Sequence, residues 1–180
     1  MLKITIPAVD GWDEQKEEFV QLKEQTLQLE HSLVSLSKWE SKWCKVFLDS
    51  RREKTHEETL DYIRCMTLTP NVDPDVYNRL TIENVAMINE YIEAPMTATY
   101  FSKDAKSNSS EQVTSELIYY WMIALNIPFE CQKWHLNRLL TLIKVCNIKN
   151  QPAKKMNMRE VMSRNAALNA ARKKRLNTRG

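Results

Sequence analysis

Glycine is almost absent from this chain of 180 residues, which has only Gly11 and Gly180. Glycine-rich loops cradle phosphates with their backbone N–H groups, and glycine supplies the positive φ of tight turns. The scarcity therefore argues against a nucleotide-binding loop and against many tight hairpins, and it favours helices. The composition, with 43% apolar and 27% charged residues, is that of an ordinary globular domain with a real core.

Long hydrophobic runs are also missing. The longest apolar stretch covers residues 118–127, includes Asn126, and is too short to cross a bilayer. The first residues, MLKITIPAVDGW, lack a basic region followed by a sustained apolar stretch, so we expect no signal peptide. We therefore expect no membrane among the partners.

Paired cysteine motifs are absent as well. The four cysteines are widely spaced and form no CxxC pair, and three of them fall within helical patterns. Free, buried thiols in a reducing cytosol are the expectation, and a disulfide or zinc framework is the alternative. The cysteines are Cys44, Cys65, Cys131 and Cys146.

Catalytic signatures do not occur. The chain has no GxSxG, P-loop, kinase or deaminase motif, and its three histidines form no HExxH. Cys131 and His135 lie four residues apart and could pair as nucleophile and base or bind a metal, but no further ligand is suitably spaced. We interpret His135 as a hydrogen-bonded residue at the edge of the core, and the acidic clusters at 13–18 and 51–58 as solvated. We predict that the protein is not an enzyme and has no catalytic, cofactor or metal site.

The most apolar and aromatic stretch is Tyr119–Val145, with the sequence YYWMIALNIPFECQKWHLNRLLTLIKV. Apolar residues recur at helical spacing on both sides of Asn126-Ile127-Pro128. The residue before a proline is biased out of the helical region, so the pattern predicts a break there. We expect the two helices to fold back on one another and to form the core of the molecule.

The N-terminal segment predicts a small antiparallel sheet. Residues 2–7 alternate between apolar and polar and stop at Pro7, and short alternating runs follow at 19–22 and 27–29. Asp10-Gly11 has the composition of a turn. The alternative is one helix from residue 14 to residue 47, where Glu and Lys are dense.

Helices are predicted after residue 32. Trp39 and Trp43 share one face of the first helix, as large core residues or, alternatively, as a platform for stacking bases. Further helix starts are predicted from capping residues: Thr55 with Glu58, Asp73 with Pro74, Thr81 for a helix to about Glu93, and Glu111.

The net charge of +3 is unevenly distributed. Residues 153–180 hold nine Lys and Arg against one acid, Glu160, so this segment is +8 and residues 1–152 are −5. We predict a mainly α protein in which a small β segment (1–31) and a helical core (32–152) form one domain, followed by a basic helical arm (153–180). The arm could bind an acidic protein surface, contact nucleic acid without aromatic stacking, or be a solvated tail.

Several segments resemble proteins from the structural modules of tailed bacteriophages, of the tail-assembly chaperone type. The resemblance covers most of the chain. The segments are TLQLEHSLVSLSKWESKW, TLTPNVDPDVYNRLT, PMTATYF, IYYWMIALNIPFECQKWHLNRLLTLIKVCNIKN and KKMNMREVMSRNAALNAARKKRLN.

The resemblance implies an assembly protein that binds a tail component, such as the tape-measure or tail-tube protein, in the host cytoplasm. It supplies no catalytic motif. The alternatives are a virion structural protein (a connector, baseplate or tail component) and a nucleic-acid-binding protein, and a homo-oligomer is possible. The residues expected to bind the partner are Lys154, Lys155, Arg159, Arg164, Arg172, Lys173, Lys174, Arg175, Trp134 and Arg138.

Overall fold

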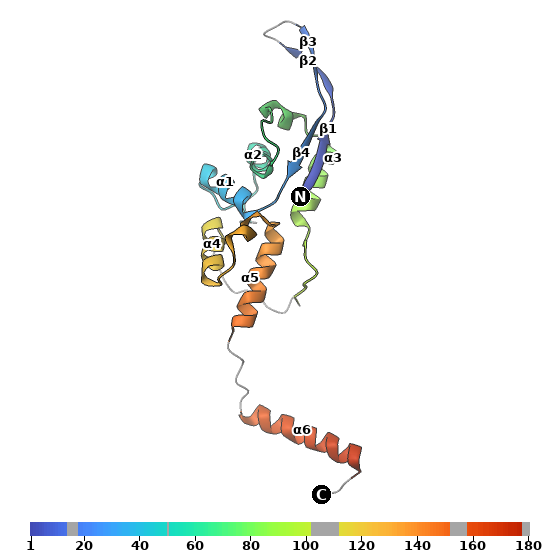
Figure 1. Ribbon diagram of the computed structural model, residues 1–180, viewed down its shortest axis with the longest axis vertical. Coiled ribbons are helices and arrows are strands. Elements are labelled where there is room, and N and C mark those ends of the chain that lie inside the picture. The colour runs from blue at the N-terminus through green and yellow to red at the C-terminus, as the bar shows by residue number, and fades with distance from the viewer. Residues whose placement is uncertain (14–17, 50, 102–111, 152–157, 178–180) are drawn as a thin grey trace. The chain divides into compact units, whose positions relative to one another are not determined.

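The computed structural model of the chain describes residues 1–13, 18–49, 51–101, 112–151 and 158–177. The protein is mainly helical with a small antiparallel sheet at the N-terminus, which confirms the predicted fold class (Figure 1). The chain divides into a compact unit, Met1–Cys146, and a second unit, Asn147–Gly180. The sequence suggested a boundary at residues 152 and 153 instead.

The sheet is a two-stranded ribbon in two consecutive ladders. Strand β1 pairs with β4 and β2 with β3, both antiparallel. The residue numbers of every pair add up to 31, from Leu2↔Leu29 to Asp13↔Glu18, so the two ladders share one register. The strands are β1 (Leu2–Ile6), β2 (Val9–Asp13), β3 (Glu18–Leu22) and β4 (Gln25–Leu29).

Alternation along the ribbon decides which face enters the core. Ile4, Ile6 and Leu27 are buried, whereas the intervening Lys3 and Thr5 are exposed, as the period of two requires.

The turn predicted at Asp10-Gly11 is wrong. Gly11 lies inside β2, opposite Val20, because the register anchored in the core continues through both ladders. Asp13 and Glu18 form the last pair of this ladder.

Helix α1 (Leu33–Trp43) begins at Ser32, whose hydroxyl accepts the Ser35 N–H. It ends at its C-cap Cys44, which has a φ of 51°. Trp39 is fully buried and donates its indole N–H to the Glu58 carbonyl at 2.8 Å. Trp39 is therefore a core residue and cannot offer its face to a base.

The predicted caps after Thr55, Asp73 and Thr81 are confirmed. Thr55 forms a capping box with Glu58 before α2, and Thr81 forms one with Asn84 before α3. Asp73 caps a 3₁₀ helix, η1. The elements are α2 (His56–Met66), η1 (Pro74–Arg79) and α3 (Ile82–Glu93).

The predicted break at Asn126 falls directly after the C-cap of a helix, Leu125. Asn126 has a φ of 52°, and the Ile127 N–H donates to the Met122 carbonyl at 2.8 Å, as in a Schellman motif. Helix α4 begins after Thr114, later than the predicted start at Glu111, a residue outside the described ranges. The elements are α4 (Ser115–Ala124), η2 (Phe129–Lys133) and α5 (Leu136–Asn150).

The expectation that a hairpin of two helices makes up the core is wrong. Helix α4 packs on α1, and the core joins the β1–β4 ribbon with side chains from α1 to α5. The start of α5 is bonded to the segment that follows β4, since the Leu136 N–H donates to the His31 carbonyl at 2.7 Å. Local periodicity identified both helices but not the partners that each would choose.

The second unit contains α6 (Met158–Leu176). The described side chains of this helix, which do not include those of residues 160 and 161, are all exposed.

Candidate functional site

Three groups of side chains bear on function: a set of buried carboxylates, a buried histidine cluster and the basic helix α6. The first two lie in the compact unit and the third in the second unit.

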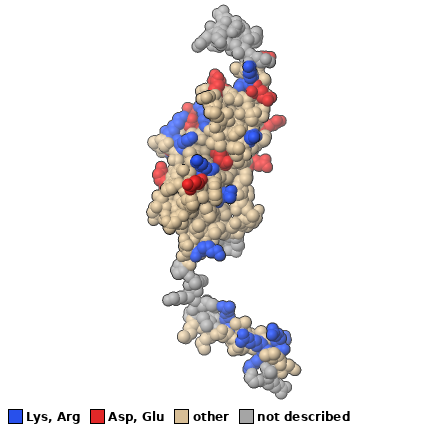
Figure 2. Space-filling view, viewed as in Figure 1, with Lys and Arg blue, Asp and Glu red and all other residues tan. Residues whose placement is uncertain are grey.

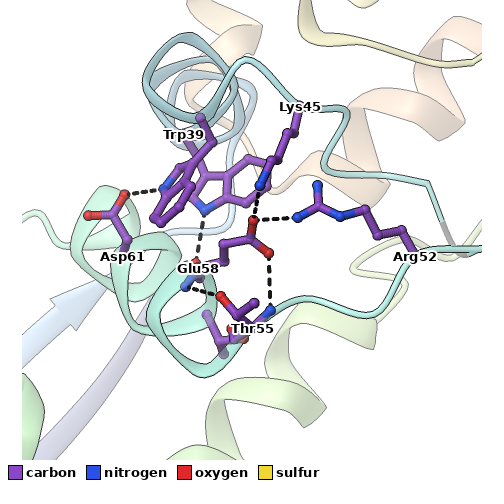
Figure 3. Close-up of polar contacts among 8 residues, drawn as sticks. Trp39, Lys45, Arg52, Thr55, Glu58 and Asp61 are labelled. Atoms are coloured by element: carbon purple, nitrogen blue, oxygen red, sulfur yellow. Dashed lines mark hydrogen bonds and ion pairs between the residues drawn. The ribbon is translucent and has the colours of Figure 1, made fainter.

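The Glu58 carboxylate is the centre of the ionic contacts around α2. It is 1% exposed, accepts the Lys45 ammonium at 2.8 Å, and also binds the Arg52 guanidinium (Figure 3). Its other oxygen accepts the Thr55 N–H at 3.0 Å. These contacts, the Lys45 bond foremost, lower the pKa of Glu58 to about 2. The carboxylate is therefore fully engaged and ionised, and it acts as a structural group.

Two other buried carboxylates accept hydrogen bonds at both of their oxygens. Glu40 accepts the N–H groups of Phe47 and Ser115 at 2.9 and 2.7 Å, which ties the start of α4 to α1. Asp61 accepts the Trp43 indole N–H at 2.8 Å and pairs with Lys42. The predicted solvated acidic face at 51–58 is thus wrong for Glu58, because the fold places two cations and a helix cap around it.

A histidine cluster lies where the end of β4 meets the start of α5. The His31 and His135 rings are edge to face at 5.1 Å, and Tyr62 lies with its hydroxyl 2.6 Å from His31 Nδ1. Burial, followed by the nearby His135, lowers the pKa of His31 to about 4. Burial raises the pKa of Tyr62, so the phenol stays protonated and donates to His31. Both groups are neutral near pH 7.

His135 is fully hydrogen-bonded and not paired with Cys131. Its Nε2 donates to the Tyr91 carbonyl at 2.9 Å, and its Nδ1 accepts the Asn137 N–H at 3.3 Å. Burial raises the pKa of the Cys131 thiol, which disfavours the nucleophilic thiolate. These bonds confirm the interpretation of His135 as a satisfied residue at the edge of the core.

The cysteines are all free, but their burial differs from the expectation. Cys131 is buried, Cys65 and Cys146 are half-buried, and Cys44 is exposed at the C-cap of α1. Within the described ranges, no group of three His, Cys, Asp or Glu side chains is arranged to hold a metal ion.

Helix α6 carries most of the predicted partner-binding residues. Six Lys and Arg and one Glu give its nineteen residues a net charge of +5, and blue side chains gather along it in Figure 2. Four consecutive cations lie at the C-terminal end of the helix, where the negative end of the helix dipole favours them. The helix holds Arg159, Arg164, Arg172, Lys173, Lys174 and Arg175, whereas Lys154 and Lys155 lie outside the described residues.

Trp134 and Arg138 are brought together in the compact unit. The Arg138 guanidinium lies 4.1 Å from the centre of the Trp134 ring, a cation–π contact one helical turn apart. Trp134 is half-buried and Arg138 is exposed, so the guanidinium of this pair is accessible at the start of α5.

Comparisons with protein-family models, with curated proteins and with solved structures find no match for this chain. In the part of the chain that the structure describes, no helix combines the length and apolarity needed to cross a bilayer.

Proposed function

We propose that this protein is an assembly protein that binds an acidic surface of a partner through the basic helix α6. Following the resemblance of its sequence, we assign the partner to the tail components of a tailed bacteriophage, such as the tape-measure or tube protein. Binding would take place in the host cytoplasm during virion assembly.

The exposure of α6 is the observation that carries this proposal. Most of the stability of a helix in a protein comes from packing an apolar face against neighbouring structure rather than from intrinsic propensity. Helix α6 is nineteen residues long, and its described side chains are exposed, Met158 and Met162 among them. A binding partner would supply the packing that the helix lacks. Flexible methionines suit such an adaptable contact.

The charge distribution defines the chemistry of the partner. Residues 147–180 hold ten Lys and Arg and one acid, a net charge of +9, whereas residues 1–146 hold sixteen and twenty-two, a net charge of −6. An acidic protein surface complements the arm, and complementary charge increases the rate and specificity of association.

Nucleic acid is the second candidate partner. The four consecutive cations Arg172–Arg175 would neutralise phosphates, although no aromatic residue lies on α6 to stack on bases. A virion component, with the arm bound to a neighbouring subunit, is the remaining alternative.

The test is affinity capture from infected host cells, with the partner identified by mass spectrometry. The full chain is compared with a chain ending at Gln151 and with a variant in which Arg172, Lys173, Lys174 and Arg175 are all replaced by Glu. We expect a tail protein to be recovered by the full chain alone.

The control reverses four exposed lysines of the compact unit, Lys3, Lys23, Lys38 and Lys133, to Glu, which changes the net charge by the same amount. This control should still capture the tail protein. Recovery of the tail protein by the shortened chain or by the variant of the arm would contradict the proposal. Recovery that is lost on nuclease treatment would favour nucleic acid. Presence of the protein in purified particles would favour a virion component.

A further inference from the structure

A pocket of about 260 Å³ opens between α2 and α3 in the compact unit. Helix α2 packs on α1 and η1, whereas α3 packs on β1. The two helices are therefore positioned by different neighbours. The pocket is lined mainly by apolar side chains: Phe47, Tyr62, Ile63, Val85, Ile88 and Ile92, with Lys54, Thr59 and Asn89 as the polar members.

The pocket has an apolar floor and a polar mouth. Tyr62, Ile63 and Ile88 are at most 2% exposed, and Phe47 is also buried. Asn89 is exposed and Lys54 is half-buried. Ligand sites in proteins commonly combine an apolar lining with a few polar groups that orient the ligand.

Lys54 is the one cation among the described residues that line the pocket, and no carboxylate among them lies within ion-pair distance of it. Its ammonium lies 4.3 Å from the centre of the Phe47 ring, and among the described residues it forms no ion pair. Two carboxylates act on the charge of Lys54, and both are ion-paired with other residues: Glu58 with Lys45 and Arg52, and Asp49 with Arg51.

Burial removes water from the Lys54 ammonium, which is unfavourable for the charge. Burial lowers the pKa of Lys54 more than the Glu58 and Asp49 carboxylates raise it, so the charge is only partly compensated. An anion placed at the mouth would complete this compensation. The apolar floor would at the same time favour a ligand with a hydrocarbon or aromatic body.

We propose that this pocket binds a small amphipathic monocarboxylate, with its carboxylate on Lys54 and its apolar body against Ile63, Ile88 and Phe47. The volume is slightly below the roughly 300–1,000 Å³ of pockets for drug-sized ligands, so the ligand is limited to a short chain or a single ring system. This site is independent of the basic arm and of the partner proposed above.

The test is isothermal titration of the full chain with octanoate, with octanamide as the uncharged ligand of the same shape. We expect octanoate to bind saturably and at least tenfold more tightly than octanamide. Lys54→Gln should remove this preference, and Lys54→Arg should retain most of it. Lys38→Gln, at an exposed lysine outside the pocket, is the matched control and should bind like the unaltered chain.

A second variant tests the location independently of charge. Val85→Phe places a larger side chain in the pocket and should abolish binding of both ligands, while circular dichroism confirms that the protein is folded. Equal affinity for octanoate and octanamide, no binding of either, or unchanged binding by Lys54→Gln would each overturn the proposal.

Discussion

The imidazole rings of His31 and His135 meet edge to face at 5.1 Å, although 103 residues separate them in the chain. The contact joins the end of β4 to the start of α5, and two tyrosines complete it: Tyr62 bonded to His31 and Tyr91 packed against His135. Both histidines are buried and neutral near pH 7. The cluster therefore makes the stability of the compact unit depend on pH.

We expect the compact unit to lose stability as the pH falls below about 6.5. The pKa of His31 is about 4 in the folded protein and about 6.5 when unfolded, so below pH 6.5 the unfolded chain binds the proton first. The contribution is complete above pH 6.5 and is lost progressively toward pH 4. From His31 alone we expect a loss of about 2 kcal/mol between pH 7.5 and pH 5.

Urea denaturation at the two pH values measures this loss. His31→Asn should reduce the pH dependence, and His56→Asn, at an exposed histidine, is the matched control. The effect of Glu58, with its pKa of about 2, falls at lower pH and does not overlap. A pH dependence unaltered by His31→Asn would contradict this account.

Glu58→Gln should destabilise the compact unit by about 2 kcal/mol, because it removes a buried charge from two cations and weakens a capping box. The measurement is the free energy of unfolding in urea at pH 7. Glu57→Gln changes the adjacent exposed carboxylate and should cost less than about 0.5 kcal/mol. Equal losses for the two variants would show that the contacts of Glu58 add no stability.

Asn126→Gly should be tolerated, whereas Asn126→Ala should lower stability by about 1 kcal/mol. The residue has a φ of 52°, which Gly adopts freely and which costs Ala about 1–2 kcal/mol. Thermal unfolding of both variants measures the difference. The C-cap geometry would be refuted if Ala proved at least as stable as Gly.

Removing residues 152–180 should change the unfolding free energy of the remaining chain by less than about 0.5 kcal/mol. The exposed side chains of α6 indicate that this helix contributes little to the core. The same truncation should reduce the far-ultraviolet helical signal only if α6 is folded without its partner. A large fall in stability would mean that the arm is part of the folded core.

The helix starts were largely predictable from the sequence. Thr55, Asp73 and Thr81 cap helices with side chains that reach only two or three residues along the chain, so the signal is local. The break at Asn126 was predictable for the same reason, because asparagine tolerates positive φ and a proline follows two residues later.

The partners of each element were not predictable in this way. Glu58 looks like one acid among several in a charged stretch, and only the fold brings Lys45 and Arg52 to it. Lys54 belongs to no sequence motif. Its role in the proposed pocket depends on its contact with Phe47 and on the space between α2 and α3.

The helical class, the N-terminal ribbon, the caps and the basic C-terminal arm can be derived from the sequence, because hydrophobic period, capping chemistry and charge act over a few residues. The contact of His31 with His135, the burial of Glu58 and the packing of α4 on α1 depend on the folded chain as a whole. Such contacts depend on the free energy of the whole core, in which burial is nondirectional and many pairings compete. For that reason a local pattern can specify an element without specifying its neighbour.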